Sequence, residues 1–154
     1  MLSGKLIHLI ESHWDEIVAR VVDQIRREPQ MTHFQTIAQT ELREWGQALL
    51  QNLGHWLAAG NEDDLAHKYE HLGKLRFEED VPLYESVHAL CIIREKMLDF
   101  VEEHIFSKSS LELYAEEELE RRLGRFFDLL TIHLVRGYER ALRQASSHAG
   151  LITR

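Results

Sequence analysis

Apolar residues recur at three- and four-residue intervals along most of the chain, which is the spacing of an amphipathic α-helix. Two prolines and eight glycines are the few helix breakers in 154 residues, and no stretch has the alternation typical of a β-strand. The pattern predicts helices over residues 3–28, 32–59, 61–80, 82–106 and 111–145. Gly46 or the stretch Asn52-Leu53-Gly54 would divide the second helix by a bend, so we expect an all-α bundle of five or six helices.

Capping residues mark where these helices begin. Thr32 is the expected N-cap of the second helix, because a threonine hydroxyl can accept from a free backbone N–H there. Pro82 stands in the first turn of the fourth helix, where its missing N–H costs nothing, and Asp80 is the expected cap before it. Ser109 or Ser110 is expected to cap the last helix. We assign residues 1–146 to one helical domain and residues 147–154 to a frayed tail.

The last two predicted helices are apolar on more than one side. In the fourth, a main stripe contains Leu83, Val87, Leu90, Cys91, Met97, Leu98, Val101 and Ile105, and a second stripe contains Tyr84, Ala89, Ile92, Ile93 and Phe100. A monomer of this size does not easily bury two such helices, so we expect a homodimer in which both contribute to the contact. In the alternative, the N-terminal helix covers the excess within a monomer.

Polar residues inside these apolar stripes are the candidates for a binding site. Arg94 falls between Leu90 and Leu98, where an unpaired charge would cost several kcal/mol. It therefore needs a carboxylate partner, or its long stem carries the charge to the surface. Asp128, Glu78 and Glu79 are the expected partners. We predict a small-molecule pocket near the third, fourth and fifth helices, and its candidate lining residues are Arg76, Tyr84, His88, Arg94 and His133.

Composition and charge narrow the classes of function. The formal net charge of −8 disfavours a nucleic-acid partner. No run of apolar residues is long enough to span a membrane, and the N-terminus lacks the apolar core of a signal peptide, so we expect a cytoplasmic protein. The single cysteine, Cys91, fits a reducing compartment, and we expect it to be a small apolar core residue.

Candidate chemistry is sparse. His67 and His71 lie four residues apart and could share a metal, but no second motif accompanies them, so we expect a solvated helix face and no metal. Length and helix content would suit a haem protein, with His88, His104 and His133 best placed, although no sequence context marks an axial ligand. There is no glycine-rich phosphate loop, GxSxG elbow or cysteine-centred site, so we expect neither catalysis nor a cofactor.

Three stretches resemble a known bacterial family. They are LGKLRFEE at 72–79 with the following VPLYE and VHAL, FFD at 126–128 with RGYE at 136–139, and Trp14 with the IVARVV after it. Together they are similar to the RsbRD-type N-terminal domain of stressosome co-antagonists and some histidine kinases. The resemblance implies a globin-related fold without haem, a dimer through the C-terminal helices, and a sensing or scaffolding role. Its implied partner is a downstream signalling protein or a fused output domain.

Overall fold

Seven α-helices and one short 3-10 helix form the computed structural model, which describes residues 2–58, 60–105 and 109–152. The elements are α1 (Gly4–Ser12), α2 (Trp14–Arg27), η1 (Phe34–Thr36), α3 (Gln39–Leu50), α4 (Leu53–Leu57), α5 (Glu62–Glu78), α6 (Leu83–Glu103) and α7 (Ser110–Ile152). No strand occurs in the described ranges, so the all-α prediction is confirmed. No helix within them is both long enough and apolar enough to cross a membrane.

Two of the predicted helices are each divided. The first breaks at His13, which lies between α1 and α2 and whose ring Nδ1 is 3.0 Å from the carbonyl oxygen of Leu9. The second breaks just before α4 at Asn52, one of the two bends that the sequence allowed. These breaks raise the helix number above the five or six expected.

The predicted helix start at Thr32 is wrong, because the chain forms η1 before α3 begins at Gln39. The cause is Glu85, near the start of α6, whose side chain is fully buried. Its carboxylate accepts hydrogen bonds from the backbone N–H groups of His33 (3.0 Å) and Phe34 (3.2 Å). A carboxylate from a distant part of the chain therefore fixes this turn, and such a contact leaves no trace in the local periodicity.

The junction between α5 and α6 also differs from the prediction. Asp80 ends α5 rather than capping α6: it has a left-handed φ of 59°, a conformation that aspartate tolerates better than most residues. Val81 N–H donates to Arg76 O (2.9 Å) and Asp80 N–H to Phe77 O (3.1 Å), the two bonds of a Schellman motif. Pro82 precedes the first residue of α6 and lets the chain turn into it.

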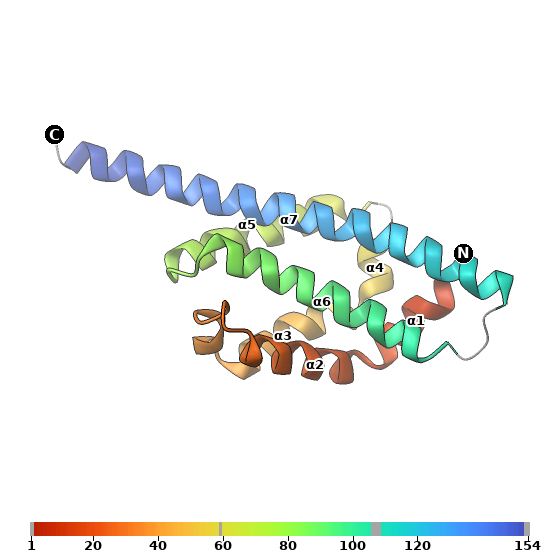
Figure 1. Ribbon diagram of the computed structural model, residues 1–154. Coiled ribbons are helices and arrows are strands. Elements are labelled where there is room, and N and C mark those ends of the chain that lie inside the picture. Colours follow the sequence, from red (N-terminus) through yellow and green to blue (C-terminus); the bar gives the residue numbers. More distant parts are fainter. Residues whose placement is uncertain (1, 59, 106–108, 153–154) are drawn as a thin grey trace.

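Helix α7 is the longest element. The hydroxyl oxygen of Ser109 accepts from the backbone N–H of Glu112 (3.3 Å), so the predicted serine cap is confirmed. The helix ends at Ile152 rather than near residue 145, and the predicted tail therefore begins inside it; residues 153–154 lie outside the described part of the chain. Its carboxy-terminal part extends beyond the other helices (Figure 1).

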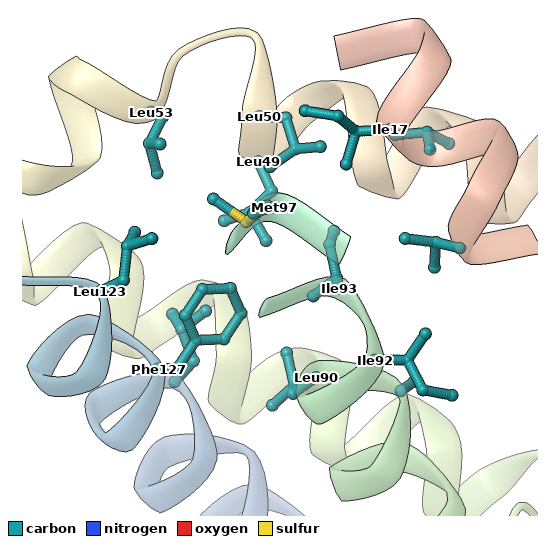
Figure 2. Packing of buried hydrophobic residues seen from close by; sticks show 14 of the residues in the cluster. Ile17, Leu49, Leu50, Leu53, Leu90, Ile92, Ile93, Met97, Leu123 and Phe127 are labelled. Atoms are coloured by element: carbon teal, nitrogen blue, oxygen red, sulfur yellow. The ribbon is translucent and has the colours of Figure 1, made fainter. Parts of the chain in front are cut away.

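Helix α6 lies at the centre of the bundle. It contacts α1 and α2 on one side and α5 and α7 on the other, and α7 runs antiparallel to it (Figure 1). Its side chains Ile93, Met97 and Phe100 have no exposed surface. Figure 2 shows Met97 and Ile93 between Ile17, Leu49, Leu50 and Leu53 above and Leu123 and Phe127 below. One continuous core therefore joins the N-terminal helices to α7.

The rotation of α6 corrects two predictions. Its buried apolar residues are Ala89, Leu90, Ile92, Ile93, Met97, Phe100 and Val101. All of the predicted second stripe except the exposed Tyr84 therefore faces the core, whereas part of the main stripe does not. Cys91 is exposed, and its expected place in the core is wrong. Both stripes are apolar, and packing against the N-terminal helices decided which one is covered.

Arg94 lies at the edge of α6, half-buried. Among the described residues it forms no ion pair, with Asp128, Glu78, Glu79 or any other carboxylate. Of the two outcomes that the sequence allowed, the structure has the one in which the long side chain reaches solvent.

Candidate functional site

Arg76 is the most buried of the five predicted site residues, with an exposed fraction of 3%. Its Nη1 donates to Glu79 Oε1 at 3.0 Å and to Glu41 Oε1 at 3.4 Å, and its guanidinium lies 5.4 Å from the centre of the Phe34 ring. It also lines a cavity of about 10 Å³ beside Ser86. These contacts fasten the end of α5 to α3 and η1.

The other four predicted residues do not meet in one cavity. Tyr84 is 56% exposed, and its hydroxyl donates to the carbonyl oxygen of Gln30 (2.9 Å). His88 and Arg94 are half-buried on α6, whereas His133 lies on α7. Whether any of the five contacts a ligand stays a prediction.

Helices α5 and α7 pack most extensively of all pairs, and two glycines allow their close approach. A Cβ added at Gly73 would collide with the carbonyl oxygen of Leu134 and lie 2.8 Å from the backbone nitrogen of Tyr138. A Cβ added at Gly137 would collide with the carbonyl group of Glu70 and lie 2.7 Å from its Cα. At this crossing each glycine faces the backbone of the other helix, so neither position has room for a side chain.

A polar cluster and an aromatic pair flank the glycines. Glu70 Oε1 accepts a hydrogen bond from Arg140 Nη1 at 3.0 Å. Glu70 Oε2 lies 2.9 Å from His133 Nδ1 and accepts a hydrogen bond from it when that ring nitrogen carries the proton. Partial burial acts to raise the pKa of Glu70, but the His133 bond and the nearby arginine charges outweigh it and lower this pKa. The rings of Phe77 and Tyr138 meet edge to face at 5.5 Å. The crossing is therefore tight and polar on one flank.

The other side of α5 borders a cavity of about 210 Å³ between α3, α4 and α5. Its lining is mostly apolar and includes two tryptophans. The residues are Trp45, Ala48, Leu49, Trp56, Leu65, Lys68, Tyr69, His71, Leu72 and Leu75. None of the five predicted site residues is among them, so this apolar cavity lies on a different face from the one that we expected.

The two indole N–H groups at this cavity have defined acceptors. Trp45 Nε1–H donates to the Tyr69 hydroxyl oxygen (3.3 Å) and Trp56 Nε1–H to the carbonyl oxygen of Ala48 (3.0 Å). The Lys68 ammonium lies 4.9 Å from the centre of the Trp56 ring. Burial raises the pKa of the Tyr69 phenol far above its usual 10.0, although the Trp45 hydrogen bond acts in the opposite direction. The phenol therefore stays protonated and keeps a hydrogen to donate.

Exposed apolar side chains gather on the last two helices. Among the described residues, the large ones are Leu2, Tyr84, Leu111, Leu113, Tyr114, Ile132 and Leu142. All except Leu2 lie on α6 or α7. The exposed Cys91 and the half-buried Val87 and Leu98 add to the outer surface of α6.

Two of the candidate histidines, His67 and His104, contact a backbone carbonyl oxygen four residues earlier in the chain. His67 Nδ1 lies 2.7 Å from the carbonyl oxygen of Asp63, and His104 Nδ1 lies 2.8 Å from that of Phe100, on whose ring it stacks. Within the described part of the chain, no group of three or more His, Cys, Asp or Glu side chains is arranged to hold a metal ion.

Comparison with known proteins identifies one family. The family model described as the RsbT co-antagonist protein rsbRD N-terminal domain matches residues 15–150. The match spans α2 to nearly the end of α7 and contains both crossing glycines and the whole cavity lining. No curated protein and no solved structure matches the chain.

Proposed function

The chain belongs to the family of RsbT co-antagonist protein rsbRD N-terminal domains, and from this membership we propose that it is a non-enzymatic sensing or scaffolding domain of a bacterial signalling protein. It acts as a homodimer upstream of an output partner, which is a fused domain or a separate protein. Its setting is the cytoplasm, as the single cysteine suggests. A globin-related fold, which the family resemblance implies, is part of the same proposal.

The observation that carries the dimer is the exposed apolar surface of α6 and α7. Apolar patches on a soluble protein commonly mark contacts with another protein, and a two-fold contact uses the same patch on both copies. The length of α7 supports the coupling to an output partner. A continuous helix of 43 residues can transmit a shift or rotation along its axis from the bundle to whatever it contacts at the far end.

Light scattering at micromolar concentration tests the dimer. We expect a mass of twice the 18.1 kDa of one chain. Ile132→Glu places a charge on the outer surface of α7, where the native side chain is 55% exposed, and should reduce the mass to that of one chain. Ala38→Glu is the control, since Ala38 is exposed at the start of α3, which packs chiefly against α2, and it should leave the dimer intact. A wild-type mass near 18.1 kDa would contradict the proposal.

A haem-binding gas sensor or oxygen-binding globin is the alternative, and the positions of the candidate histidines do not favour it. None of His88, His104 and His133 lines the cavity of about 210 Å³, so this cavity offers no histidine from that set as an axial ligand. We expect no Soret band after incubation with haem. A strong Soret band that disappears when one of these histidines is replaced would favour the alternative.

A further inference from the structure

We propose that the cavity between α3, α4 and α5 binds a small aromatic carboxylic acid, with its ring system between Trp45 and Trp56 and its carboxylate at Lys68. The proposal gives a ligand class to the sensing role proposed above and rests on that role.

The walls of the cavity favour a flat apolar body. Trp45 comes from α3 and Trp56 from α4, and leucines of α3 and α5 complete the lining. Both indole N–H groups already donate within the protein, so a ligand need not satisfy them and meets mainly the ring surfaces. Aromatic rings gain from offset or edge-to-face contact beyond the area that they bury. A compact aromatic ligand therefore matches this space better than a polar one.

The charges at the cavity favour an anion. Lys68 and His71, one turn apart on α5, are exposed and line the cavity, whereas no aspartate or glutamate does. Lys68 forms no ion pair with any described carboxylate, and its ammonium rests over the Trp56 ring. A carboxylate bound there would gain a charge-assisted hydrogen bond without displacing an existing partner.

Tyr69 supplies a second polar contact inside the cavity. Its hydroxyl oxygen accepts from Trp45 and, within the described part of the chain, the hydroxyl hydrogen has no acceptor. A buried donor without an acceptor is unfavourable, and a bound molecule with an oxygen in reach would remove that cost. The cavity thus offers a donor at its wall and a cation at its opening, the arrangement that orients a small ligand.

The three tryptophans provide a built-in test by nuclear magnetic resonance. Trp45 and Trp56 line the cavity, whereas Trp14 lies on α2 under Arg43. Titration of the full chain with 2-naphthoate should shift the indole N–H signals of Trp45 and Trp56 and leave that of Trp14 unchanged. The neutral 2-naphthamide should bind about tenfold more weakly, since it lacks the charge. No shift at millimolar 2-naphthoate, equal shifts of all three signals, or equal affinity for the amide would overturn the proposal.

Variants identify the groups responsible. Lys68→Gln should weaken 2-naphthoate about tenfold and leave 2-naphthamide unchanged. Lys74→Gln is the matched control, because Lys74 is also exposed on α5 but lies outside the cavity near Glu78, and it should bind like wild type. Ala48→Phe adds a ring from an exposed position into the cavity and should abolish binding while the chain stays folded by circular dichroism. Binding that survives Ala48→Phe in a folded protein would place the ligand elsewhere.

The titration tests the binding site and the mass measurement tests the dimer, so a negative result in one leaves the other proposal standing. A monomer that binds 2-naphthoate would contradict the proposed dimer and support the site. A dimer whose tryptophan signals do not move would contradict the site alone.

Discussion

Helix α5 meets α7 on one side and the corner between α3 and α4 on the other, and the two contacts differ in how much room they leave. Towards α7, Gly73 lies against backbone atoms of Leu134 and Tyr138, with no space for a methyl group. Towards α3 and α4, side chains as large as Trp45 and Trp56 still leave a cavity of about 210 Å³. Helix α5 thus has two unlike faces. We call the face that packs closely on α7 the fixed face, and the face that borders the cavity the open face.

This difference indicates a division of labour within the bundle. Close-packed contacts respond to small displacements by switching or breaking rather than by deforming smoothly. A ligand that enters the open face of α5 would push on a helix whose other face cannot yield without moving α7. Because α7 is the element that extends beyond the bundle, the tight crossing would carry the proposed signal from the cavity towards the far end of α7 (Figure 1).

Adding one methyl group where α5 crosses α7 should change the free energy of unfolding more than any other substitution proposed here. Gly73→Ala or Gly137→Ala forces the two helix backbones apart, and we expect a loss of about 3 kcal/mol or more in the free energy of unfolding. Chemical denaturation measures it. Gly124→Ala is the matched control on α7: a Cβ there meets nothing within 4 Å, so the substitution should stabilise the helix by up to about 1 kcal/mol. Equal behaviour of the three variants would show that the crossing is not tight.

Removing the charge beside the crossing should have an intermediate, pH-dependent effect. Because the folded pKa of Glu70 is lowered below its usual 4.5, its contribution to stability is complete above that value and is lost as the pH falls through the folded pKa. Glu70→Gln should therefore cost about 1 kcal/mol at neutral pH, discounted for partial exposure, and progressively less below pH 4.5. Urea denaturation of both proteins across this range gives the difference. A constant difference would exclude the charge as its source.

Adding methyl groups at the cavity beside α5 should have the smallest effect on stability, and it should stabilise the chain rather than destabilise it. Ala48→Leu extends an exposed side chain over the cavity, and the apolar area that it covers should stabilise the chain by less than about 1 kcal/mol. Thermal unfolding is sensitive enough to detect this. A loss like that of Gly73→Ala would mean that the cavity has no spare room, and the contrast between the two faces would disappear.

Much of the fold could be predicted from the sequence, because helix periodicity and caps are local signals. The serine cap of α7 and the central place of α6 follow from residues close together in the chain. The exposure of Cys91 could not be predicted, since α6 has two apolar stripes and only packing against α1 and α2 decides which is buried. The turn at η1 likewise depends on Glu85, which lies far along the sequence from His33.

The candidate sites were harder to predict for a geometric reason. Gly73 and Gly137 lie inside the stretches that resemble the family, and a glycine within a helix is a signal of close approach. Their pairing nevertheless needs the crossing of two helices. The cavity is lined by Trp45, Trp56 and Lys68 from three different helices. Within each helix, the residue fits the ordinary alternation of apolar and polar positions and does not stand out in the sequence. A space between elements has no signature in any one of them.

Native-state hydrogen exchange followed by nuclear magnetic resonance tests the contrast most directly, because it reports the opening free energy of each amide. Amides of α5 and α7 around Gly73 and Gly137 should exchange only by global unfolding, with a free energy equal to that from chemical denaturation. Amides of the short α4, at the open face, should exchange through local opening at a clearly lower free energy. If α4 were as protected as the crossing, or if the crossing opened first, the account of a fixed and an open face of α5 would be wrong.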